Sequence, residues 1–285
     1  MPTLAALSGL DDKVLSQADV AAFNLLCATG LPGAENLEIG RLLDWLDDAA
    51  ERVSLETRRH WYRYRESPGI YKNSRGYYCS YFLLQVLQED FGVRYNATRA
   101  ADPSFQDSRR VPDFRDSRDL FIHGIIDGHG GTCGSMPVVY VAVGRRLGYP
   151  LKLVETRAHL FIRWDDPLGT RFGVPERFNI EGAGYGMASY PDSHYETWPE
   201  PWTSAEFAAG CYLRSLSPRE ELASFLATRA HCLIDNRRPT EAIQAFRWAS
   251  TLVPKDERYR NELARLQRWL CPSPQQIYER HMALV

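Results

Sequence analysis

The most constraining feature of the sequence is a run of three short strand patterns in the middle of a chain that is otherwise helical in pattern. The first two are LKLVET, from Leu151, and HLFIRW, from His159, and the third is RFNIEG, from Arg177. A turn signal rich in Asp, Pro and Gly follows the second strand, at residues 165–169. Because two strands joined by a turn are typical of a hairpin, we expect a small antiparallel sheet here.

Helical patterns precede these strands. Apolar residues recur near a 3.6-residue period over residues 40–64, and this segment ends at Pro68 and Gly69. A second helix is predicted over residues 77–92, ending at its glycine. The polar stretch at residues 96–118 is predicted to be a long surface loop.

The chain becomes helical again after Glu220. From there to Pro254, the pattern of small and large residues matches the helix–turn–helix unit of about 34 residues that forms a tetratricopeptide repeat. A third amphipathic helix is predicted over residues 256–270. Since a single repeat cannot bury its own apolar face, we expect these helices to pack on the preceding part of the chain or on another chain. The predicted division is a helical N-terminal region, a core and a helical C-terminal segment, at residues 1–118, 119–217 and 218–285.

Composition narrows the possible functions. The net charge is −2 and no long run of one charge sign occurs, so neither nucleic acid nor a membrane surface is an expected partner. The N-terminus lacks a signal-peptide pattern, and no stretch approaches the roughly 18 apolar residues that a spanning helix needs. The six cysteines are scattered without a C-x-x-C pair, so neither a zinc site nor a disulfide framework is expected. We therefore expect a cytoplasmic protein that needs no metal and no organic cofactor.

Cys133 is the cysteine whose surroundings suit chemistry. A glycine-rich approach at residues 128–132 precedes it, and an apolar run at residues 138–143 follows it. A helix over this run would start close to Cys133, because Pro137 is accepted only in a first helical turn. The valines of the run would also suit a strand. At a helix start, free N–H groups and the helix dipole favour a thiolate and can hold an oxyanion. The other five cysteines are expected to be small buried apolar residues.

His159 is the candidate base for this thiol, because it opens the second strand pattern shortly after the apolar run. Its imidazole needs a third group that fixes its tautomer and orientation. Asn179 and Glu181 share one face of the third strand, and either is a candidate for that role.

His123 flanks the approach to Cys133 and is either an oxyanion donor or a loop histidine without a special role. The residues beside Cys133 that are expected to bind substrate are Gly131, Thr132, Gly134 and His129. Aromatic residues that form either the walls of a substrate groove or a packed loop are Tyr185, Tyr190, Tyr195, Trp198 and Trp202.

These segments, in this order, resemble the core of the transglutaminase-like superfamily. The resemblance is strongest to the bacterial branch in which this core is joined to C-terminal tetratricopeptide helices. In that family a Cys at a helix start, a His on one strand and an Asp on the next strand form the site. Cys133 and His159 match the first two positions, whereas the third position holds Glu181, with Asn179 two residues earlier. The resemblance covers residues 119–186 and the helices at residues 220–270.

The resemblance implies an α+β fold with a papain-like core, followed by tetratricopeptide-like helices. It also implies acyl-transfer chemistry on the amides of a peptide or protein: hydrolysis, deamidation or cross-linking. The alternative is a non-catalytic scaffold of the same fold, which would bind protein partners through its C-terminal helices.

Overall fold

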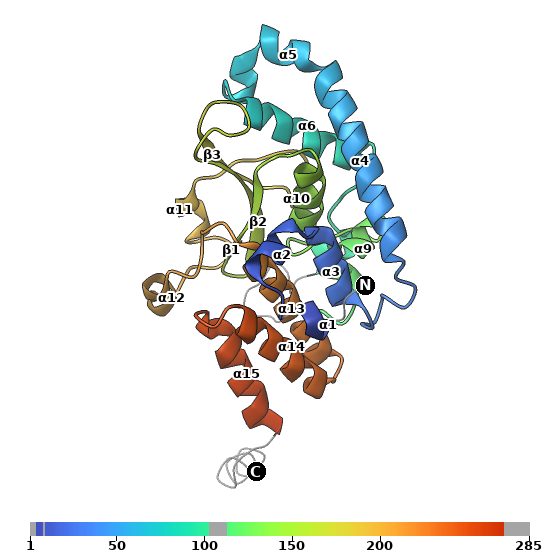
Figure 1. The fold of residues 1–285 in the computed structure, drawn as a ribbon, viewed down its shortest axis with the longest axis vertical. Helices are drawn as coiled ribbons and strands as arrows, with labels where there is room; N and C mark the ends of the chain where they lie inside the picture. The colour runs from blue at the N-terminus through green and yellow to red at the C-terminus, as the bar shows by residue number, and fades with distance from the viewer. Residues whose placement is uncertain (1–3, 8, 103–112, 271–285) are drawn as a thin grey trace.

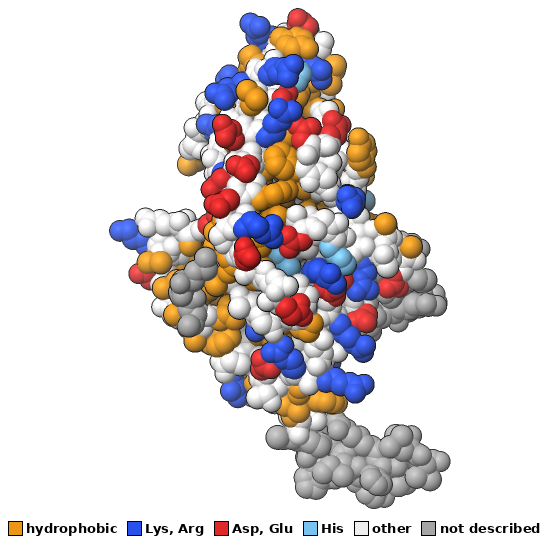
Figure 2. All heavy atoms as spheres, turned by 90° about the vertical axis from the view of Figure 1, so that its right-hand side faces the viewer, with side chains coloured by type: hydrophobic (Ala, Val, Ile, Leu, Met, Phe, Trp, Pro, Cys, Tyr) orange, Lys and Arg blue, Asp and Glu red, His pale blue; other side chains and the backbone are white. Residues whose placement is uncertain are grey.

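The computed structural model describes residues 4–7, 9–102 and 113–270, and it has a mixed α+β fold. Helices surround a small antiparallel sheet, with α10 on one face of the sheet and the segment that carries α11 on the other (Figure 1). None of the helices within these described ranges combines the length and the apolar content needed to cross a membrane. On the face of the molecule drawn in Figure 2, acidic and basic side chains are interspersed.

The three predicted strands form one antiparallel sheet in the order β1-β2-β3, which confirms the predicted sheet. Their bounds are Leu151–Thr156 for β1, His159–Asp166 for β2 and Glu176–Ile180 for β3. Thr156 pairs with His159, so a turn of only two residues joins β1 to β2. This tight turn places His159 at the very start of β2.

The apolar run after Cys133 is helical and forms α10, Met136–Arg146. Pro137 lies in the first turn of α10, where backbone N–H groups have no hydrogen-bond partner within the helix, so that a proline is tolerated. The side chains of this helix from Met136 to Gly144 are all buried, and a Cβ at Gly144 would overlap the Leu151 side chain of β1. The close approach of α10 to the sheet therefore fixes the segment that carries Cys133.

The N-terminal part of the chain is helical, as predicted. The bounds are α1 Leu4–Leu7, α2 Asp12–Gln17, α3 Val20–Ala28, α4 Ile39–Arg59, α5 Trp61–Glu66, the 3-10 helix η1 Pro68–Tyr71 and α6 Arg75–Glu89. The single helix expected over residues 40–64 is in fact α4 and α5, which are interrupted at His60. The His60 ring contacts the Glu56 carbonyl at 3.1 Å and stacks on Phe82 of α6, and its backbone leaves the helical region with ψ near 11°.

The predicted loop over residues 96–118 is partly wrong. Asn96 caps a short helix, α7, Ala97–Ala101, by accepting hydrogen bonds from two backbone N–H groups of its first turn. The part of that loop at residues 103–112 lies outside the described residues. The chain then continues through η2 Ser117–Asp119 and α9 Ile122–Ile126 to the segment of Cys133.

Two short helices, α11 Asp192–Tyr195 and α12 Ser204–Ala209, follow the sheet. Three longer helices complete the chain: α13 Pro218–Asp235, α14 Pro239–Leu252 and α15 Glu257–Leu270. Ser217 and Glu220 form a capping box that starts α13.

The C-terminal helices pack on the preceding part of the chain, which is one of the two arrangements expected for a single helical repeat. Arg145 of α10 makes a bidentate ion pair with Glu221 of α13 at 2.5 and 2.9 Å, and the Glu221 side chain is almost fully buried. Arg229 donates to the carbonyl groups of Cys27 and Thr29, both at 2.7 Å. The buried apolar core accordingly runs without a break from the N-terminal helices to α15.

Candidate active site

Cys133 lies on the turn that leads into α10. The Thr132 carbonyl accepts a hydrogen bond from the Met136 N–H at 3.0 Å, which closes a helical turn around the cysteine. The Thr132 hydroxyl accepts from the Gly134 N–H at 3.2 Å, and the Thr132 N–H donates to Ser135 Oγ at 3.0 Å. Cys133 therefore lies in a hydrogen-bonded turn that leads into the helix, which begins at Met136 with Ser135 as its N-cap. The predicted helix start close to Cys133 is found, but Cys133 itself precedes the helix.

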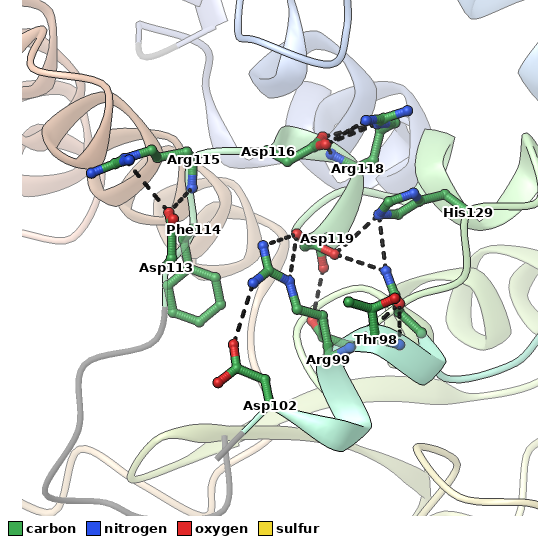
Figure 3. A network of polar contacts seen from close by, with 12 residues as sticks. Thr98, Arg99, Asp102, Asp113, Phe114, Arg115, Asp116, Arg118, Asp119 and His129 are labelled. Carbon is green, nitrogen blue, oxygen red and sulfur yellow. Dashed lines mark hydrogen bonds and ion pairs between the residues drawn. The ribbon is translucent and has the colours of Figure 1, made fainter. Parts of the chain in front are cut away.

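The buried residue Asp119, whose carboxylate belongs to the polar network in Figure 3, anchors this turn through its backbone carbonyl. Its backbone carbonyl accepts hydrogen bonds from the hydroxyls of Thr132, at 2.8 Å, and Ser135, at 3.3 Å. Its carboxylate accepts from Arg99 Nε and Nη2, at 2.9 and 2.7 Å, and from the Asn96 amide at 3.1 Å. The turn of Cys133 is therefore held by the backbone carbonyl of Asp119, a residue that sequence reasoning did not single out, while Arg99 and Asn96 hold the Asp119 carboxylate.

His159 joins the cysteine to a second carboxylate. His159 Nε2 lies 2.7 Å from Glu181 Oε2, and the same imidazole lies close enough to Cys133 for the thiol to affect its pKa. Burial alone would lower the pKa of His159, but the hydrogen bonds and charges of Cys133 and Glu181 outweigh it and raise the pKa to about 9. The histidine side chain is only 3% exposed, so this site favours a buried imidazolium.

Glu181 is itself held from three sides. The Ala183 N–H donates to Oε1 at 3.0 Å, and the Tyr195 hydroxyl donates to Oε2 at 3.3 Å. The Glu181 backbone pairs with Ala188 just beyond the end of β3. Tyr195 stacks at 6.2 Å from the His159 ring, and Trp198 meets that ring edge-on at 4.8 Å. Two of the aromatic residues singled out in the sequence therefore fix the imidazole and its carboxylate.

Asn179, the other candidate for the third position, does not contact His159. It pairs with Arg163 across the sheet, and its Oδ1 accepts from Arg163 Nε at 2.7 Å. Its amide nitrogen donates to Asp192 at 2.7 Å and to the Tyr190 carbonyl at 3.0 Å. Two residues along a strand span about 6.6 Å, so only one of the two side chains can reach the imidazole. The structure gives that place to Glu181.

Tyr95 is a neighbour of Cys133 that the sequence did not indicate. Its phenol lies beside the Cys133 backbone, and burial raises the pKa of the phenol, which keeps it protonated. Tyr95 reaches this place because it forms a parallel bridge with Gly131, which the Asn96 N–H to Gly131 carbonyl bond of 2.8 Å reinforces. No local spacing or motif carries this signal, since the contact arises only from the tertiary fold.

A cavity of about 480 Å³ opens beside Cys133 and His159. Thr132, Gly134 and Glu155 line it on the side of the core. Residues of the C-terminal helices line the opposite side, and they are Ser224, Phe225, Ala227, Thr228, His231, Asp235, Phe246, Arg258, Tyr259 and Glu262. The thiol and imidazole therefore face a space that the core and the C-terminal helices enclose together.

The remaining expected substrate-binding residues have other partners. Gly131 is required by packing, since a Cβ there would overlap Ile125 and Met136 at 2.6–2.9 Å. His129 faces the Asp119 carboxylate, with Nε2 at 3.2 Å, and belongs to the anchor of the cysteine turn (Figure 3). His123 is buried between Ser117 Oγ and the Gly33 carbonyl, each at 3.2 Å. These three residues do not line the cavity at Cys133.

The arrangement can carry out nucleophilic chemistry. A thiol, a base within hydrogen-bond reach and a carboxylate that orients the base are the three parts that an activated nucleophile requires. Comparisons of this chain with protein-family models, with curated proteins and with solved structures find no match.

Proposed function

We propose that this protein is a cysteine acyl-transfer enzyme of the transglutaminase-like type, with Cys133 as nucleophile, His159 as base and Glu181 as the group that orients His159. The observation that carries the proposal is the continuous chain of contacts from Glu181 through His159 to Cys133, which ends at an open cavity. A family likeness supports it. A helix that begins shortly after the cysteine packs on an antiparallel sheet, and the histidine at the start of β2 and the acid just beyond β3 follow in the order that the family has. A papain-like core and a tetratricopeptide unit in α13–α15 are parts of this proposal.

The reaction follows from the placement of these groups. In the reacting form the thiol proton has already passed to His159, which is held as an imidazolium, and Cys133 Sγ attacks the carbon of a carboxamide as a thiolate and forms a C–S bond. The tetrahedral intermediate then loses its C–N bond, and His159 returns the proton to the departing ammonia or amine. Water or a second amine attacks the resulting thioester and releases Cys133. His159 takes a proton from the attacking group in that step.

Tyr95 is a candidate for stabilising the oxyanion of the tetrahedral intermediate. Its phenol lies beside the Cys133 backbone and retains its proton, because burial raises its pKa. The Tyr95 O–H is therefore suited to donate a hydrogen bond to the oxyanion.

The cavity suggests the class of substrate. Its walls combine apolar side chains such as Phe225 and Phe246 with three carboxylates, Glu155, Asp235 and Glu262. Apart from His159, the described lining residues include a single Arg and no Lys, and this residue, Arg258, pairs with Glu155 at 2.9 Å. A neutral carboxamide side chain as acyl donor and an amine or water as acceptor suit such walls better than an anionic substrate does.

The decisive experiment is covalent labelling of the full chain. The probe is a short peptide in which a chloromethyl ketone replaces the side-chain carboxamide of glutamine. Intact-protein and peptide mass spectrometry would show a single adduct on Cys133, formed in the native protein and in Cys211→Ala but absent from Cys133→Ala. Cys211 is the matched control because it is also a partly exposed free thiol.

Undiminished labelling of Cys133→Ala would reject the assignment of the nucleophile. A native Cys133 that reacts no faster than Cys211 would instead support the non-catalytic scaffold. If the probe labels Cys133 selectively, ammonia release from glutamine peptides with and without an added primary amine then separates hydrolysis from transfer.

A further inference from the structure

We propose that the protein has a second ligand site, which binds a small molecule with a planar ring and a phosphate group, as in a nucleoside monophosphate. The site is a cavity of about 390 Å³ between α4, α5, α6 and the turn that follows β2. The residues that carry the argument are Thr57, Arg58, Trp61, Arg75, Arg171 and Phe172. These helices form the end of the molecule opposite α13–α15 (Figure 1).

Aromatic rings hold two of the arginines at this cavity. The Arg75 guanidinium lies 5.0 Å from the centre of the Trp61 ring and 5.2 Å from that of Phe172. The Arg171 guanidinium lies 5.2 Å from Phe172 and 5.6 Å from Tyr149. Cation–π contacts occupy the faces of a guanidinium and leave its N–H edges available. The aromatic rings therefore position both groups, and of their N–H donors only Arg171 Nη2 is used within the described part of the chain, in a hydrogen bond to the Leu147 carbonyl at 3.1 Å.

The arginines of this cavity have no acidic partner within the described part of the chain. Arg58 donates to the Ser54 carbonyl at 3.2 Å, and Arg171 donates to the Leu147 carbonyl at 3.1 Å. Among the described residues, no carboxylate forms an ion pair with Arg58, Arg75 or Arg171. By contrast, Arg146 pairs with two aspartates. Three cationic groups that face one hollow without neutralisation favour an anion, and planar guanidinium forks match the oxygens of a phosphate.

The inner wall of the cavity supplies an independent observation. Thr57 is more than nine-tenths buried, and its hydroxyl lies beside the Tyr149 phenol without making a hydrogen bond of normal geometry to any described residue. A buried hydroxyl that lacks a partner is unfavourable, and native proteins rarely leave one. A polar atom of a ligand in the cavity would satisfy it.

The size and lining of the cavity indicate the part of the ligand other than its phosphate. A volume of about 390 Å³ is at the lower end of the range for small-molecule sites. Trp61 and Phe172 line the cavity beside the guanidinium groups and offer apolar contact to the planar ring of a ligand. A ring that lies on these side chains while its phosphate reaches the arginine edges uses every feature of the site. The proposed acyl-transfer activity is not needed for this binding, because no residue lines both cavities.

The test is isothermal titration calorimetry of the full chain with adenosine monophosphate, adenosine and inorganic phosphate. We expect adenosine monophosphate to bind at least about tenfold more tightly than either fragment, since the ring and the phosphate contribute separately. Arg75→Gln and Arg171→Gln are each expected to weaken binding at least about tenfold, the size of one lost charge-assisted contact. Thr57→Val, which keeps the shape of the side chain, is expected to weaken it several-fold.

Arg65→Gln is the matched control, because Arg65 is exposed on the neighbouring helix α5 and does not line the cavity. It makes the same change in net charge and is expected to leave binding within about twofold. Circular dichroism melting of each variant shows that the fold is retained. The proposal is overturned if none of the three compounds binds the native protein, or if Arg65→Gln weakens binding as much as Arg75→Gln does.

Discussion

Replacement of Glu181 by Gln changes the charge beside His159 while it keeps the length and shape of the side chain. Glu181 Oε2 lies 2.7 Å from His159 Nε2, and the carboxylate is almost fully buried. The substituted amide can still accept a hydrogen bond through its oxygen, so the imidazole keeps a partner. The variant therefore isolates the contribution of the negative charge.

The expected size of the effect follows from the strength of this contact. A hydrogen bond to a charged group contributes about 1.5–3 kcal/mol, roughly twice the contribution of a neutral one. The loss of the charge therefore removes about 1–1.5 kcal/mol from the stabilisation of the imidazolium, and the lost Coulomb attraction adds to this. Since one pKa unit corresponds to about 1.4 kcal/mol, we expect the pKa of His159 to fall by about one to two units from its native value of about 9.

The sign of the pH dependence follows from the raised pKa. In the native protein the imidazolium persists below pH 9 and is lost as the pH rises through about 9. His159 must be protonated to donate to the leaving amine, so acyl transfer is expected to decline on the alkaline side at that pH. In Glu181→Gln the same decline moves to about pH 7–8, because the pKa is lower by one to two units.

The assay is a heteronuclear NMR titration of the imidazole signals, with the His159 resonance identified by its absence from His159→Gln. Glu176→Gln serves as control, since it makes the same change elsewhere on β3 at a residue that contacts Gly76 rather than His159. A His159 midpoint that is the same in Glu181→Gln as in the native protein would refute the role given to Glu181. So would an equal shift in Glu176→Gln.

Two further predictions concern the anchor of the cysteine and the wall of its cavity. Asp119→Asn removes the buried charge that faces Arg99, and we expect it to lower the free energy of unfolding by about 3 kcal/mol in urea denaturation. Asp102→Asn, at a more exposed partner 3.6 Å from Arg99, is expected to cost less than about 1 kcal/mol, and equal losses would contradict this ranking. Ala227→Trp places a large ring in the cavity beside Cys133 and is expected to slow labelling by the peptidyl chloromethyl ketone at least about tenfold, with little change in the rate of alkylation by the much smaller iodoacetamide. Equal slowing of both reagents would indicate that the substitution disturbs Cys133 itself rather than the cavity.

The sheet and the long helices could be predicted because their signals are local. The alternating strand patterns, the capping residues of α13 and the place of Pro137 each depend on a few consecutive residues. The break between α4 and α5 could not be predicted in this way. Its cause is the stacking of His60 on Phe82, which belongs to α6 and is distant in the sequence.

In the candidate site, too, the residues with local sequence signals could be predicted, whereas those that depend on tertiary contacts could not. Cys133 and His159 could be selected from their surroundings in the sequence, but the choice between Glu181 and Asn179 could not be made, because both lie on one face of the third strand. The register of β2 and β3 decides it, since Asn179 is placed opposite Arg163. Tyr95 reaches Cys133 through a tertiary bridge, and no pattern in the sequence marks such a contact.

The packing of the C-terminal helices determines how the enzyme and scaffold hypotheses can be separated. Removal of α13–α15 would appear to test whether these helices bind partners independently of the site. However, they supply one wall of the cavity at Cys133, and Glu221 of α13 neutralises Arg145 of α10 in a buried pair. Truncation would therefore open the cavity, leave Arg145 without its partner and expose core residues. Loss of activity and loss of partner binding would then both follow from damage to the fold. Point substitutions that face the cavity, such as Ala227→Trp, leave the buried contacts of α13 in place and can distinguish the two hypotheses.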